Sequence, residues 1–256
     1  MQFGVCTGIE NAEIARVAGF AFVEPTVRSL HSGKDFAVIQ AAHAAARLPT
    51  PTFNVFVPGD LKITGPAVDR AKLQVYVAES LRRVKSVGGE LVVFGSGGAR
   101  NIPDGFDRAT AWQQLIDFLR MVAVEADKTG VSIAIEPLNK RESNLINSVA
   151  EGVKLAQVID RSSIRVLADL YHMQEDAEPT DTVVANAAWL THVHVADSGR
   201  LSPGTGTYPY TAFFSYLKST GYAGRIAVEC KWQDFEAEAS AAVAYLHKMW
   251  DEADGC

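Results

Sequence analysis

The sequence has few cysteines, no cluster of basic residues and no long apolar run. Its 256 residues contain three cysteines, Cys6, Cys230 and Cys256, without motif spacing, so we expect reduced thiols in the cytoplasm. No stretch approaches the roughly 18 to 20 apolar residues of a membrane span, and the N-terminal residues lack the features of a signal peptide. A net charge of -6 without a Lys/Arg cluster argues against nucleic-acid binding.

No Gly/Ser/Pro-rich linker divides the chain, so we expect a single (β/α)8 barrel domain over residues 1–256. Apolar strand-like runs alternate with helical patterns from end to end, which predicts parallel strands joined by helices. An open doubly wound sheet is the alternative, but no GxGxxG follows the first strand. The eight expected strands are residues 2–6, 21–24, 50–57, 91–94, 131–136, 165–169, 191–196 and 225–229.

Helices are predicted between these strands from apolar spacing and from capping patterns. Residues 68–87 and 235–250 repeat apolar side chains every three or four positions. Thr110 with Gln113, and Ser148 with Glu151, resemble capping boxes that open two further helices.

Four of the expected strands deliver a polar side chain at the same end. Glu136, Asp169, His194 and Glu229 lie at the C-terminal tips of the fifth to eighth strands, where barrel active sites lie. Three carboxylates would repel one another in a pocket, and a divalent cation removes that conflict. An oxygen-rich set with one nitrogen suits Mn²⁺, Mg²⁺ or Co²⁺ better than a structural zinc, so we predict a metal site.

Taken singly, each residue has a plainer interpretation. An acid at a strand end is more often a helix cap or a loop ion pair, and His194 alone would more often be a hydrogen-bonded core histidine. Four coincident tips favour the metal site. His192, two residues before His194, projects to the same face one layer deeper and is expected to be a buried supporting histidine.

The second half of the chain resembles the sugar phosphate isomerase/epimerase family with a xylose-isomerase-like barrel, and within it the ketose 3-epimerases (D-tagatose and D-psicose 3-epimerases). The resemblance rests on EPLNKRE with Glu136 and Glu142, DLYH with Asp169 and His172, HVADSGRLSPGTG with His194 and Arg200, and VEC with Glu229. It extends from about residue 131 to 230 without a gap, whereas the first half matches less well.

The resemblance implies a ketose 3-epimerase that holds a divalent metal, Mn²⁺ by preference, through the four strand-tip residues. Glu136 and Glu229 would be the catalytic pair, one removing the C3 proton of the sugar and the other returning it to the opposite face through an enediolate. Glu142, His172 and Arg200 would hold the carbonyl end of the substrate. The family also implies a small-molecule sugar or sugar phosphate as partner, and a homo-dimer or tetramer.

Two further residues are candidates for substrate binding from their positions alone. Arg100 lies in the glycine-rich loop FGSGGARNIPDGFD, where it could reach a phosphate or carboxylate, although the loop could equally be a turn. Glu24, at the tip of the second strand, could contact substrate or brace a ligand. The loop NVFVPGDLKITGP after the third strand could be a wall of the site or a surface connection.

Alternative functions remain open on the same metal site. An aldose–ketose isomerase such as a hydroxypyruvate isomerase, or a keto-polyol dehydratase, would use the same metal-stabilised enediolate, although hydroxypyruvate isomerases tend to show glutamine where His194 stands. An endonuclease IV-like nuclease would need more histidines than the six present, and a basic groove. A non-catalytic sugar-binding protein would be expected to have lost a ligand, yet all four are present.

Overall fold

The computed structural model describes residues 1–254 and contains eight parallel strands in one sheet. Their order around the sheet is β2-β1-β8-β7-β6-β5-β4-β3. The sheet closes between its two outer strands, because the Val27 amide donates to Asn54 O at 2.8 Å and the Asn54 amide donates to Pro25 O at 3.0 Å. The strands are β1 Phe3–Cys6, β2 Phe22–Glu24, β3 Thr52–Phe53, β4 Leu91–Phe94, β5 Ser132–Ile135, β6 Ile164–Asp169, β7 Leu190–Val195 and β8 Arg225–Val228. The predicted barrel is confirmed.

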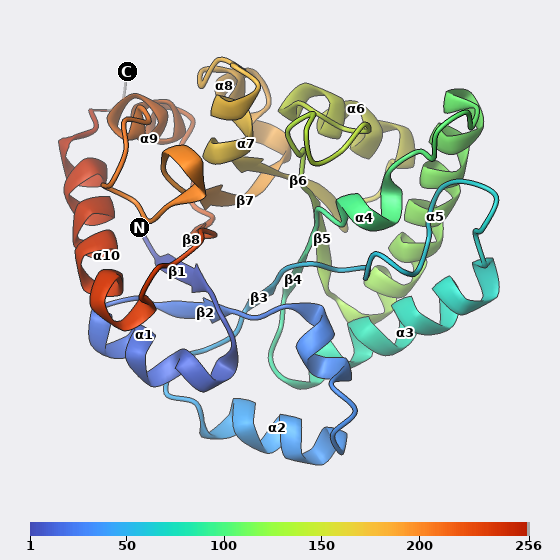
Figure 1. Ribbon diagram of the computed structural model, residues 1–256, viewed down its shortest axis with the longest axis horizontal. Helices are drawn as coiled ribbons and strands as arrows, with labels where there is room; N and C mark the ends of the chain where they lie inside the picture. The colour runs from blue at the N-terminus through green and yellow to red at the C-terminus, as the bar shows by residue number, and fades with distance from the viewer. Residues whose placement is uncertain (255–256) are drawn as a thin grey trace.

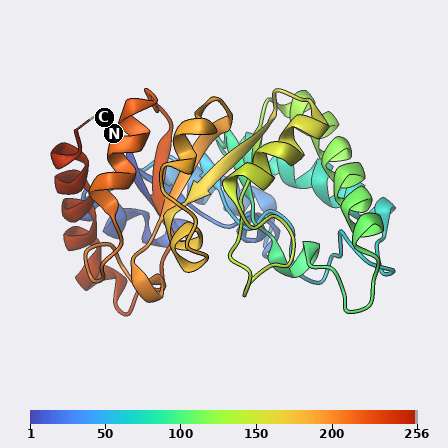
Figure 2. The ribbon, with the colours of Figure 1, turned by 90° about the horizontal axis from the view of Figure 1, so that it is seen from above.

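The helices form a ring around the strands (Figure 1), and the same arrangement is seen from above in Figure 2. They are α1 Ala12–Ala18, α2 Phe36–Ala45, α3 Arg70–Ser86, α4 Gly97–Arg100, α5 Arg108–Thr129, α6 Val149–Ile159, α7 Leu170–Glu175, α8 Thr182–Ala185, α9 Tyr210–Ser219 and α10 Phe235–Glu252. None of these described helices combines the length and apolar character needed to cross a bilayer.

Most expected boundaries lie within two residues of those in the structure, and two elements differ for a specific reason. The third strand is only Thr52–Phe53, because Val55 adopts a left-handed φ of 49° and turns the chain away from the sheet. Helix α5 begins earlier than predicted, since the side chain of Asp107, not Thr110, caps it and accepts from the Thr110 amide at 2.7 Å. The Ser148 cap of α6 is confirmed.

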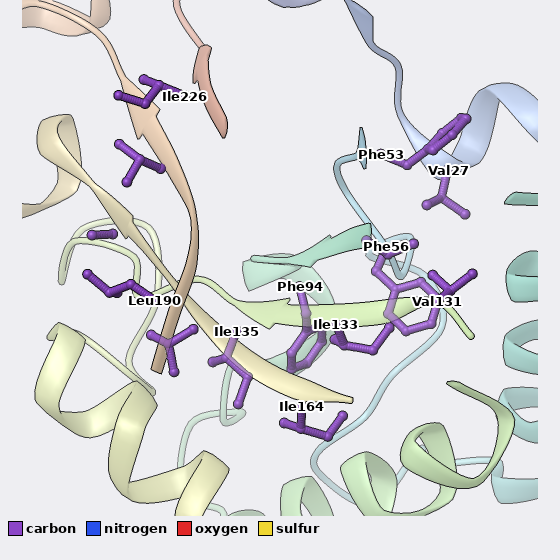
Figure 3. Close-up of a cluster of buried hydrophobic side chains, with 14 of the residues drawn as sticks. Val27, Phe53, Phe56, Phe94, Val131, Ile133, Ile135, Ile164, Leu190 and Ile226 are labelled. Atoms are coloured by element: carbon purple, nitrogen blue, oxygen red, sulfur yellow. The ribbon is translucent and has the colours of Figure 1, made fainter. Parts of the chain in front are cut away.

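The main core lies between the strands and the surrounding helices. Figure 3 shows Phe94, Ile133, Ile135 and Ile164 gathered on the outer face of the sheet. The alternate residues Leu91, Val93, Ala134 and Leu167 form a separate buried cluster inside the barrel. Because strand side chains alternate, the residues two positions beyond Ala134 and Leu167 point to this same interior. Those residues are Glu136 and Asp169.

Candidate active site

The four strand-tip residues predicted as ligands meet at the C-terminal mouth of the barrel. Asp169 and His194 are register partners on β6 and β7, and Glu136 and Glu229 follow directly after β5 and β8. One ligand atom from each lies within 4.8 Å of the others. Asp169 and His194 are 2% and 0% exposed, so water does little to relieve the crowding of charge.

The hydrogen bonds of this cluster leave one acceptor without a donor. His194 Nδ1 lies 3.2 Å from Glu136 Oε1 and 3.3 Å from Glu229 Oε2. Asp169 Oδ1 accepts from the Tyr171 amide at 2.8 Å, but the buried Oδ2 has no hydrogen-bond partner, and His172 Nε2 is 3.6 Å away. A buried carboxylate oxygen without a donor is costly. The four ligand groups therefore fit a divalent cation, which would bind this oxygen and offset the charge of the three acids.

The two glutamates have different electrostatic surroundings. Burial raises the pKa of Glu136, and the nearby negative charge of Glu229 raises it further. Burial alone would raise the pKa of Glu229 as well, but His194 and the positive charge of Arg200 outweigh it and lower the pKa to about 2. Two carboxyl groups whose surroundings shift their pKa values in opposite directions are typical of acid–base pairs.

Arg200, Glu142 and His172 also come together beside the cluster. Arg200 lies 2.7 Å from Glu229, 3.3 Å from Glu142 and 3.3 Å from His172 Nε2. Asn139 joins them, since its backbone amide donates to His172 Nδ1 at 3.2 Å and its side chain donates to Glu142 at 3.0 Å. With Nδ1 accepting this bond, the proton of a neutral His172 lies on Nε2, the nitrogen nearest to Asp169 Oδ2 and Arg200.

The backbone at Arg200 is held in an uncommon conformation. Its φ is 60°, in the left-handed region, and Gly199 before it has a φ of 71°. Outside glycine this conformation costs about 1 kcal/mol or more and is concentrated at functional sites. The guanidinium also stacks over the ring of Tyr171, with 4.8 Å between Arg200 Cζ and the ring centroid. The strained backbone and the stacking on Tyr171 together fix the direction of the Arg200 guanidinium.

Glycine and valine form much of the pocket lining. The pocket has a volume of about 220 Å³, and its lining includes Val55, Val57 and Leu138. The expected loops after β3 and β4 both contribute, through Gly59 and residues 95–98. Position 95 requires glycine, because a Cβ there would lie 2.1 Å from Glu136 Oε2. A side chain at this position would displace the glutamate.

Arg100 does not take the role suggested for it. The side chain is fully buried and outside the pocket lining, and its guanidinium donates to Phe94 O at 3.1 Å and to Glu136 O at 2.8 Å. Because the buried guanidinium is directed onto these carbonyl groups, it offers no donor to the pocket. The suggestion that Arg100 binds a phosphate or carboxylate is corrected: the residue fixes the β4 and β5 tips to each other.

Glu24 is likewise enclosed by protein groups. It is 0% exposed, and its two oxygens contact His192 Nε2 at 2.7 Å and His194 Nε2 at 2.8 Å. The suggested substrate contact is therefore corrected, whereas the interpretation as a brace for a ligand agrees with the geometry. His192 is fully buried below His194, with the two ring centroids 5.0 Å apart.

Sequence reasoning missed two amides that complete the site. Asn54 donates to Glu229 Oε1 at 3.2 Å, and Asn139 links Glu142 with His172. Asn54 follows the short strand β3 at the position where other strands carry ligands, which was the available signal. Asn139 lies between Glu136 and Glu142, and nothing in its spacing distinguished it from a turn residue.

The fold and the cluster together define an eight-stranded βα barrel with a candidate metal centre at its C-terminal mouth. Residues 12–249 match the family described as "Xylose isomerase-like TIM barrel". The chain belongs to this family.

Several curated proteins are similar to part of the chain. The D-psicose 3-epimerase of Ruminiclostridium cellulolyticum is 30% identical over 124 residues, which are 48% of this chain and 42% of that protein. The 3-dehydro-D-guloside 4-epimerase of Escherichia coli is 32% identical over 114 residues, covering 44% of each. The match thus spans less than half of these relatives. A putative hydroxypyruvate isomerase of Streptomyces coelicolor is 29% identical over 248 residues, 87% of this chain and 85% of that protein.

Solved structures with the same fold cover nearly the whole chain. The D-psicose 3-epimerase of Clostridium cellulolyticum, crystallised with D-tagatose, has a TM-score of 0.88 at 21% identity and covers 98% of this chain and 99% of that one. The 3-keto-D-glucoside 4-epimerase of Escherichia coli has a TM-score of 0.85 at 22% identity, with 97% and 99% covered. At these identities the likeness shows the fold.

Proposed function

We propose that the protein is a divalent-metal-dependent sugar epimerase that inverts C3 of a ketose. The observation that carries the proposal is the pair Glu136 and Glu229, a buried and a half-buried carboxylate with different proton affinities within one candidate metal cluster. They follow β5 and β8, which lie on either side of the β6–β7 pair in the sheet order. Two carboxylates that enter a pocket from different sides are what inversion of a carbon requires. The partial matches to named epimerases support the same interpretation.

Glu136, Asp169, His194 and Glu229 would hold the ion, with Mn²⁺ proposed and Mg²⁺ or Co²⁺ as alternatives. A bound divalent ion supplies Lewis-acid polarisation of the substrate carbonyl, which acidifies the adjacent C–H bond. Glu229, whose pKa is low, is ionised and takes the C3 proton. Glu136, whose pKa is raised, delivers a proton to the opposite face.

The residues beside the pair position the sugar. His172 and Arg200 hold the carbonyl end of the substrate, where Arg200 stabilises the negative charge that develops on the carbonyl oxygen. Glu142 accepts from a hydroxyl group, while Asn139 fixes both Glu142 and the ring of His172. These roles for Glu142, His172 and Arg200 are part of the proposal.

We further propose that the substrate is a neutral sugar. The charged residues that line the pocket are three acids, Glu136, Glu142 and Glu229, and one cation, Arg200. Arg200 is already paired with Glu229 at 2.7 Å and with Glu142 at 3.3 Å. Arg100 is turned onto backbone carbonyl groups. Even with a divalent ion bound, the ion and Arg200 offset three of the four charges of Glu136, Glu142, Asp169 and Glu229, so a phosphate or carboxylate would meet net negative charge.

A hydroxypyruvate isomerase activity is the second candidate, because the similarity to the Streptomyces coelicolor protein extends over 87% of this chain. Its substrate is an anion, which the charge of the pocket disfavours. We also propose that the protein forms a dimer or tetramer. The unpaired thiols of Cys6 and Cys230 are in keeping with a reducing compartment such as the cytoplasm, which we propose as its location.

The test is turnover of neutral ketoses, ketose phosphates and hydroxypyruvate by protein stripped with chelator and reloaded with Mn²⁺, with products separated by chromatography. We expect C3 epimers from neutral ketoses alone. In Glu229→Gln, turnover should be lost with a smaller loss of sugar binding. Conversion of hydroxypyruvate without any epimerisation would move the assignment to the second candidate.

A further inference from the structure

Glu24 is a buried carboxylate that the proposed reaction does not use. It ends β2, is fully enclosed, and is absent from the lining of the pocket. A buried carboxylate is costly unless donors surround it. The structure provides four donors, and they are Cys6 Sγ at 3.5 Å, Thr52 Oγ1 at 2.5 Å, His192 Nε2 at 2.7 Å and His194 Nε2 at 2.8 Å.

The division of these donors between the two oxygens determines where the ring protons lie. Oε1 receives His194 and Cys6, and Oε2 receives His192 and Thr52. A carboxylate can only accept, so each histidine must carry a proton on Nε2. His192 Nδ1 is buried without any partner, as fits a nitrogen without a proton.

The consequence falls on the opposite nitrogen of His194. Its Nδ1 lies 3.2 Å from Glu136 and 3.3 Å from Glu229, inside the group of atoms that could hold an ion. With Nε2–H bound to Glu24, the lone pair of a neutral His194 is on Nδ1, where it would face an ion held by this cluster. The ring cannot turn without breaking the 2.8 Å bond, and the edge-to-face packing of His192 at 78° supports it from below.

We propose that Glu24 is a positioning residue that fixes the Nε2–H tautomer of His194 and so directs Nδ1 to the metal. This inference rests on the proposed metal-dependent function. Partners that hold the second ring nitrogen of a metal-binding histidine commonly change metal affinity about 10- to 100-fold when they are removed. A carboxylate that only filled space in the barrel would have no such effect.

Mn²⁺ binding measured by calorimetry tests the proposal on Glu24→Gln and Glu24→Leu. Glu24→Leu removes the acceptors of both Nε2–H groups, whereas in Glu24→Gln the amide oxygen can stay on His194 and the NH₂ group can face His192. We expect the Mn²⁺ Kd to rise about 10- to 100-fold in Glu24→Leu and less in Glu24→Gln. Thr52→Val is the matched control, because it removes a bond to Oε2 without touching His194, and its Kd should stay within about threefold of wild type.

A second measurement uses the wild-type chain and does not depend on the folding of a variant. ¹⁵N NMR of the Mg²⁺-loaded protein should show the His194 proton on Nε2. A proton on Nδ1, or unchanged Mn²⁺ affinity in both Glu24 variants, would overturn the proposal. Mn²⁺ binding that depends on Glu24 in a protein that epimerises no sugar would leave this inference standing and reject the proposed function. Failure of the wild type to bind Mn²⁺ would reject both.

Discussion

The substitution Asp169→Asn separates the two tasks of one aspartate. Oδ1 caps α7 by accepting from the Tyr171 amide, and an asparagine oxygen does this equally well. Oδ2 has no partner among the protein groups and lies in the acidic cluster. In Asp169→Asn an NH₂ group takes its place, which cannot ligate a cation but can donate to Glu136 or Glu229.

The expected magnitude follows from the spacing of the cluster. Two ionised carboxylates at the limiting distance of 4.8 Å repel by about 3.5 kcal/mol at an effective dielectric constant of about 20. Asp169 takes part in two such pairs, partly offset by His194 and by Arg200. We therefore expect metal-free Asp169→Asn to be about 1–3 kcal/mol more stable than wild type, a rise in Tm of about 2–4 °C for each kcal/mol.

The assay is thermal unfolding with and without Mn²⁺. A roughly hundredfold excess of Mn²⁺ over its Kd should stabilise the wild type by about 2.7 kcal/mol, and Asp169→Asn should lose most of this gain. Asp107→Asn is the matched control, since Asp107 caps α5 on the surface, and it should change neither result. A less stable metal-free Asp169→Asn with a normal response to Mn²⁺ would refute the reasoning.

Three other substitutions test separate features of the structure. Arg100→Met should lower the free energy of unfolding by about 2–4 kcal/mol in urea titrations, because buried carbonyl groups lose their donor, with no change in KM for anionic relative to neutral sugars; a KM change confined to anions would restore the anchoring role. Gly95→Ala should reduce kcat/KM about 100-fold, because the new Cβ would lie 2.1 Å from Glu136 Oε2, whereas in Gly59→Ala the nearest atom is at 3.6 Å and activity should persist. Burial raises the pKa of Glu178 from 4.5 to about 7, so the folded state holds the proton between these values and the stability should fall as pH rises through them. Glu178→Gln should remove about 1 kcal/mol of this pH dependence, a figure reduced because Glu178 is partly exposed. If the free energy of unfolding from urea titrations changed equally with pH in wild type and variant between about pH 5 and 8, the prediction would be contradicted.

The barrel and the ligand cluster could be predicted because both follow from local patterns. Each apolar run became a strand of the sheet, and the alternation of side chains placed Glu136 and Asp169 on the inner face. The shortened third strand could not be predicted, because Val55 has strong β propensity and only the tertiary structure imposes its left-handed φ.

The roles of Arg100 and Glu24 depend on where a side chain turns after its loop is built. A sequence places Arg100 in a glycine-rich loop beside the mouth of the barrel, but it does not show that the donors are needed by carbonyl groups at the tips of β4 and β5. Glu24 lies 170 positions from its partner His194 in the sequence. The bond between them appears only when the barrel closes.

The most direct test of the account is proton NMR in D₂O with Mn²⁺ activation followed by chelation, or with Mg²⁺ throughout, on neutral ketoses. The account predicts deuterium at C3, appearance of the C3 epimer, and loss of both in Glu229→Gln. Deuterium at C1 with formation of an aldose would contradict it and identify an aldose–ketose isomerase that uses the same cluster.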